Sequence, residues 1–389
     1  MQPNDFFHRT ALAQRLADEL LSSDGSSGLF ITGPRRTGKS TFIREDLIPA
    51  LSARGGQGSG GCQVVYADLW DDRAANPGDV IVAAIRAELL KFDGFVLRAA
   101  KGVGLDKIKV GGLEMSLDHI GFGKGETLTK ALTLLAAASK KGIVLIIDEA
   151  QQSQATEEGR QALYALKAAR DALNASAGPG FRLLATGSSS DKLAALVDDK
   201  DQAFYQAPLQ PLPTLGSDYL AWVHSKLRFD PRPSPASLAR AFDACNHRPE
   251  PLRGVLRELA LVTDVSAPDI DARFEAMVSA NLARAKHSVV RQINGLMPLD
   301  AAVLKVMAQT GKQFAPYSKA AYAQYKALMQ ASTGEPAGPV NQSAVQGALE
   351  RLRADKFIWR AGRGAYLIED PQHLGWIRDL AQDDGSAKD

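Results

Sequence analysis

The sequence has little cysteine, no long apolar stretch and almost no excess of either charge. Its two cysteines, Cys62 and Cys245, are too few and too far apart for a disulfide framework or a structural zinc site. No stretch approaches the roughly 20 apolar residues that span a bilayer, and the N-terminal segment lacks the apolar centre of a signal peptide. The six histidines follow no metal-binding spacing such as HExxH. We therefore expect a globular, cytoplasmic protein with no membrane partner.

The overall charge and the length set only broad limits. The formal net charge is +2, which identifies no class of partner. The length of 389 residues is sufficient for two or three domains with an ordinary apolar core.

Alternating strands and helices in the first half predict an α/β domain over residues 1–210. Apolar runs that can form buried strands occur at residues 29–31, 62–70, 143–148 and 181–190, with helical periodicity between them. This alternation predicts a parallel sheet wrapped by helices. Period-two alternation around Gly111 and Gly112 also predicts a β-hairpin, inserted before the third of these strands.

The second half predicts two helical parts and a tail. The pattern is helical from residue 211 to 295, which predicts a helical lid. From residue 296 to 375, three helices followed by an alternating strand pair predict a winged-helix domain. Residues 376–389 are assigned to a tail, and its last residues, DDGSAKD, are predicted to be disordered.

The strongest motif is a phosphate-binding loop after the first strand. The segment GPRRTGKST matches GxxxxGK[ST], and its residues are Gly33, Pro34, Arg35, Arg36, Thr37, Gly38, Lys39, Ser40 and Thr41. Glycines let the backbone wrap tightly, so that several N–H groups point at phosphate oxygens. Lys39 is expected to reach the β- and γ-phosphates, and the Ser40 hydroxyl to ligate Mg²⁺.

A second motif is the acidic pair that ends the strand IVLIID. A parallel strand places Asp148 and Glu149 at the carboxyl edge of the sheet, where ligands bind in open α/β folds. We expect Asp148 to hold the magnesium shell and Glu149 to polarise the attacking water. The competing interpretation is that Asp148 caps the next helix and Glu149 faces solvent.

The strand that follows ends in a cluster of hydroxyl residues. Thr186, Ser188, Ser189 and Ser190 can touch the γ-phosphate, or they can cap the helix that follows, and the two roles are compatible. We favour Ser188 as the residue that senses the γ-phosphate and positions the water.

These motifs resemble the archaeal-type P-loop ATPases of the AAA+/STAND assemblage, with an architecture shared more distantly by origin-recognition ATPases. The resemblance rests on GPRRTGKST, the IDE and TGSS strand ends and the inserted hairpin, and it covers roughly residues 5–375. It implies a nucleotide-binding domain, a helical lid and a winged helix, with ATP and Mg²⁺ as ligands. It also implies that Phe7 and Arg9 lie near the adenine, and that Arg248, Pro249 or Arg253 of the lid contacts the nucleotide.

One departure from that group concerns arginine. No arginine occurs between Leu183 and Lys226, where ring-forming AAA+ ATPases carry the arginine that acts on a neighbouring subunit. The departure favours a nucleotide-driven switch over a processive ring motor. Arg170, Arg182 or a partner protein can supply the missing charge.

The predicted winged helix is locally basic. Between residues 297 and 368, nine basic and four acidic side chains give a net charge of +5. Its third helix opens with Asn341, Gln342, Ser343 and Gln346, and Arg360 and Arg363 lie on the predicted wing. These features favour DNA as the partner.

Two other functions fit the same sequence. The chain can be a STAND-like signalling or defence scaffold whose winged helix binds protein, with assembly into a homo-oligomer, or a nucleotide-binding adaptor with little turnover. Salt-sensitive DNA binding distinguishes the DNA-binding switch from the scaffold, and ATP turnover distinguishes both of these from the adaptor.

Overall fold

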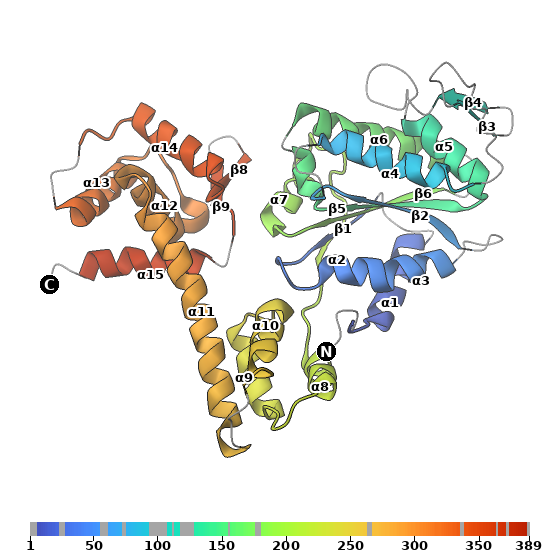
Figure 1. Cartoon of the computed structure of the whole chain (residues 1–389). Coiled ribbons are helices and arrows are strands. Elements are labelled where there is room, and N and C mark those ends of the chain that lie inside the picture. Colours follow the sequence, from blue (N-terminus) through green and yellow to red (C-terminus); the bar gives the residue numbers. More distant parts are fainter. Residues whose placement is uncertain are drawn as a thin grey trace, which may run out of the picture. The chain divides into compact units, whose positions relative to one another are not determined.

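The computed structural model describes most of the chain. The described residues are 6–22, 28–54, 61–71, 75–92, 107–110, 113–116, 128–154, 156–175, 180–262, 267–334, 338–362, 365–370 and 373–386. They form two compact units (Figure 1). The first comprises Met1–Arg228 with His247–Pro249, and the second Phe229–Asn246 with Glu250–Asp389.

A five-stranded sheet forms the centre of the first unit. Its strands are β1 (Leu29–Thr32), β2 (Cys62–Asp68), β5 (Gly142–Asp148), β6 (Phe181–Gly187) and β7 (Leu209–Pro211). They lie in the order β2-β5-β6-β1-β7, and every neighbouring pair is parallel. The predicted parallel sheet is thus confirmed. The sequence did not predict β7, which is a three-residue edge strand ending in proline, and a proline disfavours a strand assignment.

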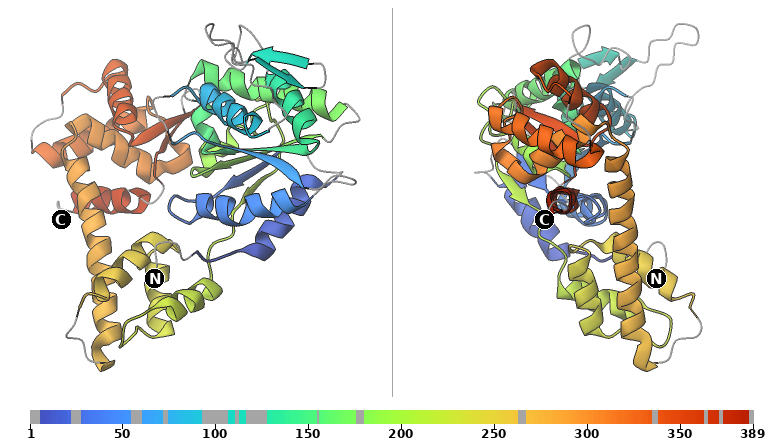
Figure 2. Two further views of the ribbon diagram at one scale, coloured as in Figure 1. Left: turned by 45° about the vertical axis from the view of Figure 1, so that its right-hand side comes forward. Right: turned by 90° about the vertical axis from the view of Figure 1, so that its left-hand side faces the viewer.

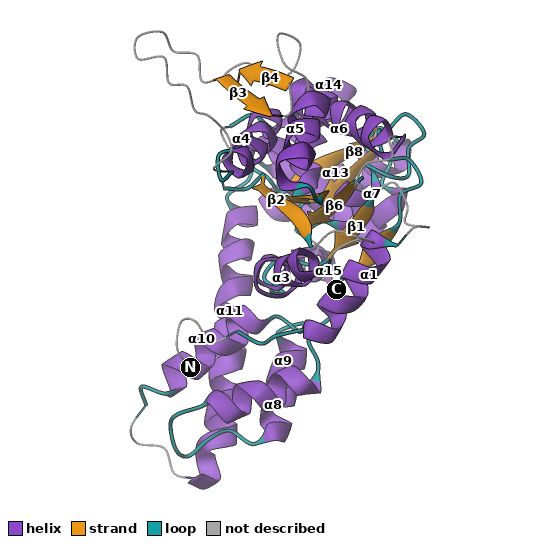
Figure 3. Ribbon diagram, turned by 90° about the vertical axis from the view of Figure 1, so that its right-hand side faces the viewer, coloured by secondary structure: helices purple, strands orange, loops and turns teal. Residues whose placement is uncertain are grey.

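Helices cover both faces of this sheet (Figure 3). On one face lie α4 (Pro77–Leu89), α5 (Leu128–Ser139) and α6 (Glu157–Ala175), and on the other α1 (Thr10–Leu21), α2 (Lys39–Phe42) and α3 (Ile48–Ala53). Side chains of β5 contribute alternately to the apolar cores on the two faces of the sheet. Leu145 packs on the face of α4, α5 and α6, and Ile146 on the face of α1, α2 and α3. A strand buried on both faces reads as a continuous apolar run, which is why IVLIID was recognisable.

A π-helical turn, Ile43–Leu47, joins α2 to α3. Its buried Asp46 accepts a hydrogen bond from the Arg9 backbone N–H (2.9 Å) and lies 2.8 Å from Nδ1 of His8. The segment before α1 is therefore held against the helical run that follows the phosphate loop.

The inserted hairpin is confirmed in its strands. Strands β3 (Lys107–Val110) and β4 (Leu113–Ser116) pair antiparallel, and Gly111 and Gly112 lie outside the described residues. The described part of the unit also contains α7 (Ser190–Ala194), α8 (Ser217–Lys226) and a 3-10 helix at Ala150–Gln154.

The regular secondary structure in the described residues of the second unit is helical apart from one hairpin. Its helices are α9 (Pro235–Ala244), α10 (Pro249–Leu259), α11 (Ile270–Asn294), α12 (Pro298–Thr310), α13 (Lys319–Thr333), α14 (Gln342–Ala354) and α15 (His373–Ser386). The 25-residue α11 contacts both α9 and α15 (Figure 2). Helices α12, α13 and α14 precede the antiparallel pair β8 (Ile358–Gly362) and β9 (Ala365–Ile368), which is the element order predicted for a winged helix.

The assignment of residues 376–389 to a tail is wrong as far as Ser386, and residues 387–389 lie outside the described part of the chain. Helix α15 extends to Ser386, with Ile377 and Ala381 buried against the core of the second unit. Nε of Arg378 also donates to the Ala308 carbonyl oxygen (2.6 Å), and Lys286 pairs with Asp379 (2.7 Å). The many polar residues at the end of the sequence favoured a tail, although they belong to an amphipathic helix. Its apolar face is recognised only through its tertiary contacts.

Among the described residues, no helix has both the length and the apolar character needed to cross a membrane.

Candidate active site

The phosphate loop joins β1 to α2 and adopts a left-handed turn at its end. Gly38 has φ +85°, a conformation that favours glycine, and it immediately precedes Lys39, the first residue of α2. The Thr37 hydroxyl donates to the Pro34 carbonyl oxygen (2.8 Å) and closes the loop. The Gly33 N–H bonds to the Gly187 carbonyl oxygen (3.1 Å), which ties the loop to the end of β6.

Strand order brings three motifs together at one edge. Strand β6 lies between β1 and β5, so its hydroxyl-bearing end falls between the phosphate loop and the acidic pair. All three strands are parallel, and their carboxyl ends therefore meet at the same edge of the sheet.

Asp148 is the buried centre of this edge, with 1% of its surface exposed. Its Oδ2 accepts hydrogen bonds from Ser40 Oγ (2.7 Å) and Tyr66 Oη (3.0 Å). Its Oδ1 accepts from the Thr186 hydroxyl and lies 3.9 Å from Lys39 Nζ. Burial by itself raises the pKa of the Asp148 carboxyl, but the Lys39 charge and the three hydroxyls outweigh it and hold that pKa below its ordinary value.

Glu149 is held from both sides of its carboxylate. Oε1 accepts from Lys39 Nζ (2.9 Å), and Oε2 accepts from Ser188 Oγ (2.7 Å) and from the Gln151 amide. Burial raises the pKa of Glu149, and the Lys39 charge with these hydrogen bonds reverses the shift, so the pKa lies below its ordinary value. Glu149 also has φ +57°, which is uncommon for a side chain of this size and typical of functional positions.

The hydroxyls after β6 divide their roles. Ser188 contacts Glu149, whereas Ser189 caps α7 by accepting from the Lys192 N–H. The capping interpretation therefore applies to Ser189, and contact of Ser188 with the γ-phosphate stays a prediction.

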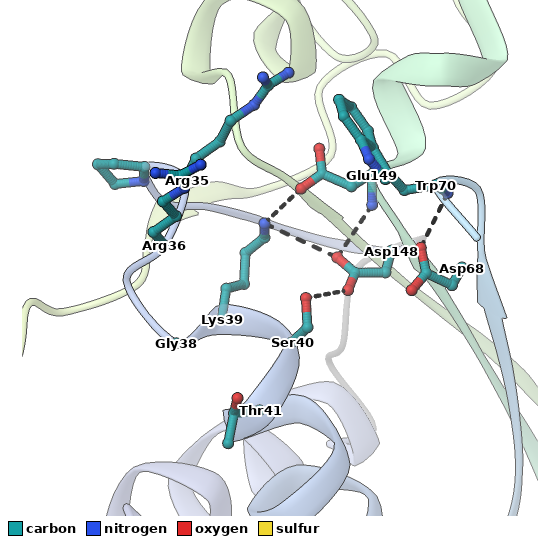
Figure 4. A pocket seen from close by; sticks show the side chains of 11 residues that line it. Arg35, Arg36, Gly38, Lys39, Ser40, Thr41, Asp68, Trp70, Asp148 and Glu149 are labelled. Atoms are coloured by element: carbon teal, nitrogen blue, oxygen red, sulfur yellow. Dashed lines mark hydrogen bonds and ion pairs between the residues drawn. The ribbon is translucent and has the colours of Figure 1, made fainter. Parts of the chain in front are cut away.

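These groups border a cavity of about 480 Å³ (Figure 4). Its lining residues are Pro34, Arg35, Arg36, Gly38, Lys39, Ser40, Thr41, Asp68, Trp70, Asp148 and Glu149. Gly33 and Thr37 of the phosphate loop, and Ser188 after β6, do not line it.

Sequence reasoning missed three residues at the end of β2. Trp70 and Asp68 line the cavity, and Tyr66 donates to Asp148. Asp68 pairs with Arg44 (3.0 Å), whose guanidinium lies 5.0 Å from the Tyr66 ring centroid. The available signal was the strand CQVVYADLW, which ends in polar and aromatic residues at the edge where parallel strands converge.

The residues implied by resemblance lie outside this lining. Phe7 packs on Tyr219 and Trp222, with ring centroids 5.5 and 5.8 Å apart, and Arg9 donates to the Pro213 carbonyl oxygen (2.6 Å). Arg248 is buried just before α10, and Pro249 and Arg253 belong to that helix. Their contacts with a nucleotide stay predictions.

The cavity fits a nucleoside triphosphate with Mg²⁺. Lys39, Arg35 and Arg36 supply positive charge for phosphates, and Gly38 leaves open space where a side chain would begin. The hydroxyl of Ser40 and the carboxylate of Asp148 are hard oxygen ligands. The described residues contain no cluster of three metal-binding side chains, and Mg²⁺ commonly binds through one or two protein groups, substrate phosphates and water.

The predicted DNA-reading residues are partly engaged within α14 and its neighbours. Asn341 caps the helix by accepting from the Ala344 N–H (2.9 Å), and Gln346 donates to Glu350 (2.8 Å) and accepts from Tyr317. Gln342 and Ser343 are exposed in the first turn. The side chain of Arg360 and the whole of Arg363 lie outside the described part of the chain.

The strand order and this site define the fold class of the first unit as an AAA+-type P-loop α/β fold. The chain is similar over its whole length to the Aeropyrum pernix ORC2 protein. The structure of that protein with ADPNP and ADP is 16% identical, covers 100% of this chain and 96% of its own, and has a TM-score of 0.55. The ADP form is 14% identical over 99% and 97%, with a TM-score of 0.58. At these identities the similarity establishes the fold.

A third solved structure is less similar. The Aeropyrum pernix ORC1 protein in complex with DNA is 15% identical over 99% of this chain and 94% of its own, and its TM-score of 0.46 is too low to support a shared overall fold. No protein-family model matches the sequence, and no curated protein matches it.

Proposed function

We propose that this chain binds and hydrolyses ATP with Mg²⁺, and that its nucleotide state controls DNA binding by the region from α12 to β9. The observation that carries the proposal is the meeting of Lys39 and Ser40 with Asp148 and Glu149 at one cavity. A buried lysine, a hydroxyl and two carboxylates of lowered pKa are the groups that phosphoryl transfer to water requires.

Each residue has a distinct role in this proposal. Lys39 binds the β- and γ-phosphates, while Ser40 and Asp148 hold Mg²⁺, which neutralises phosphate charge when bound. Glu149 orients the attacking water, and Ser188 fixes the Glu149 carboxylate through its 2.7 Å hydrogen bond. Phe7 and Arg9 are proposed to border the adenine, and Arg248, Pro249 or Arg253 to respond to the nucleotide.

The domain division predicted from sequence is retained as part of the proposal. In that division residues 1–210 bind nucleotide, residues 211–295 close over it, and residues 296–375 act on DNA. The exposed first turn of α14, with Gln342 and Ser343, supports a role in contacting DNA, because a recognition helix meets bases through its N-terminal residues.

The decisive test for hydrolysis compares wild type with Glu149→Gln, which keeps the shape of the side chain and removes its charge. We expect Mg²⁺-dependent release of phosphate from ATP by the wild type and a loss of about 100-fold or more in the variant, with retained binding of a non-hydrolysable analogue. Turnover unchanged in Glu149→Gln is incompatible with the assigned role.

The test for coupling is DNA binding by fluorescence anisotropy, with no nucleotide, with ADP and with a non-hydrolysable ATP analogue. Each state is measured at two salt concentrations. Nucleotide-dependent binding that weakens steeply with salt is expected, because phosphate contacts release counterions. Binding in no state would instead favour the STAND-like scaffold, for which ATP-dependent assembly with itself or a protein partner is the next measurement.

A further inference from the structure

Arg35 spans two strand ends from its place in the phosphate loop. Its guanidinium carbon lies 4.6 Å from the ring centroid of Trp70, which follows β2. Its Nε donates a weak hydrogen bond (3.4 Å) to the hydroxyl of Ser188, which follows β6. Figure 4 shows Arg35 directed away from the loop on the side of Trp70, whereas Lys39 points to Glu149 and Asp148.

This position brings a second cation close to the catalytic carboxylate. The Ser188 hydroxyl that accepts from Arg35 itself donates to Oε2 of Glu149 (2.7 Å). Lys39 donates to the other oxygen, Oε1 (2.9 Å). Lys39 therefore reaches Glu149 directly, and Arg35 reaches it through the Ser188 hydroxyl. Both cations line the cavity.

We propose that Arg35 is a catalytic arginine supplied by the chain itself. Its guanidinium leaves the Trp70 ring and binds the terminal phosphoryl group of ATP during hydrolysis. The inference rests on the proposed ATPase function and deepens it. The Arg35 guanidinium is itself exposed and contacts the half-buried Trp70 ring and, at 3.4 Å, the Ser188 hydroxyl, whereas its hydrogen bonds to phosphate oxygens are charge-assisted and bidentate. Transfer from Trp70 to the phosphoryl group is therefore favourable once ATP occupies the cavity.

The reaction explains why a second cation is needed. The oxygen of water forms a bond to the γ-phosphorus while the bond from that phosphorus to the bridging oxygen breaks, and the electron pair of that bond leaves with ADP. The water proton passes to Glu149. Arg35 stays protonated throughout and offsets the negative charge on the phosphoryl oxygens.

The same role accounts for the absence of arginine from one stretch of the sequence. The stretch from Leu183 to Lys226 contains no arginine to act on a neighbouring copy. A cation from the phosphate loop removes the need for one. Hydrolysis then requires a single chain, and the rate per chain is expected to be independent of protein concentration.

Kinetics at saturating ATP provide the first test. We expect Arg35→Ala to lower kcat by about 100-fold or more, and to weaken the Kd of a non-hydrolysable ATP analogue by about tenfold, because the guanidinium already contacts the phosphate in the bound state. Arg35→Lys should restore part of the rate, because it keeps the charge and loses the planar fork. Arg240→Ala, which removes an exposed arginine of the second unit, is the matched charge control.

Tryptophan fluorescence provides a readout that is independent of turnover. Addition of the non-hydrolysable analogue with Mg²⁺ should change the emission of the wild type as Arg35 leaves the ring. The change should be lost in Trp70→Phe and in Arg35→Ala. An equal change in Arg35→Ala and wild type shows that the signal does not come from Arg35, and it overturns the proposed movement.

The outcomes separate the two proposals. If ATP hydrolysis depends on Lys39 and Glu149 but kcat of Arg35→Ala stays within about threefold of wild type, the arginine inference is overturned and the ATPase function stands. A rate per chain that rises with protein concentration also overturns it, because the charge then comes from another copy. If the wild type does not hydrolyse ATP, both proposals fail.

Discussion

Ser40 and Asp148 are separated by 108 positions in the chain, yet Oγ of Ser40 donates a 2.7 Å hydrogen bond to Oδ2 of Asp148. Ser40 is in the first turn of α2, and Asp148 is the last residue of β5. The hydroxyl and the carboxylate thus form a preorganised pair of hard oxygen ligands.

Replacement of Lys39 by alanine should abolish useful nucleotide affinity. The loss of a charge-assisted hydrogen bond to phosphate costs about 3 kcal/mol, or roughly 100-fold in Kd. Titration calorimetry with a non-hydrolysable ATP analogue and Mg²⁺ measures the effect, and circular dichroism checks that the fold is retained. An affinity near that of wild type would mean that the phosphate site is assigned wrongly.

Tyr66→Phe removes the phenol that donates to Asp148 Oδ2 and keeps the ring. We expect a loss of about 1 kcal/mol in the free energy of unfolding and a reduced affinity for Mg²⁺ with nucleotide, because Tyr66 orients the carboxylate. Urea unfolding and a magnesium titration of nucleotide binding are the measurements. Tyr205→Phe, at an exposed position, is the control, and equal behaviour of the two variants contradicts the prediction.

Asp271 should make the stability of the second unit depend on pH. Its carboxylate accepts from the backbone N–H (2.7 Å) and the hydroxyl of Ser234, the residue that caps α9. The hydroxyl is the main reason that the pKa of Asp271 lies below its ordinary value. A lowered pKa in the folded state means that the unfolded chain binds more protons, so this stabilisation is present above about pH 4 and is lost as the pH falls.

The variant Asp271→Asn tests this dependence. At pH 7 it should reduce the free energy of unfolding by about 0.5–1 kcal/mol, a small effect because solvent screens this partly exposed site. The difference from wild type should shrink between about pH 5 and pH 3 in chemical denaturation. A difference that stays constant over that range contradicts the assignment.

Two neighbouring residues at the start of α14 are expected to have different roles, one in DNA contact and the other in helix capping. Gln342→Ala should weaken DNA binding by about 1–3 kcal/mol without changing Tm, because the side chain is exposed. Asn341→Ala should instead lower stability by about 1 kcal/mol, because it removes the cap to the Ala344 N–H. Anisotropy and thermal unfolding measure the two effects, with Gln330→Ala on α13 as control. Unchanged DNA affinity in Gln342→Ala would exclude this turn as the contact.

Most of the site was predictable because its chemistry is contained in short local patterns. The run GPRRTGKST specifies a loop that only glycine-rich backbone can form, and an uninterrupted apolar strand before Asp148 specifies burial on both faces of a sheet. Parallel strands then have to bring their carboxyl ends to one edge, so the meeting of the two motifs followed from strand direction.

Other features depended on contacts that no local pattern encodes. Tyr66, Asp68 and Trp70 belong to the site because β2 pairs with β5 in a register that sets Asp68 beside Asp148. The helix α15 was mistaken for a tail because its buried positions have meaning only against the core that covers them.

The sequence by itself determined the phosphate loop, the acidic pair and the alternation of strands and helices, since backbone conformation and burial periodicity are local properties. Only the tertiary structure decided which side chains face the cavity and how Ser188 and Ser189 divide their roles. It also decided that Arg35 rests on Trp70, because strand order and register determine which distant residues lie within reach of one another.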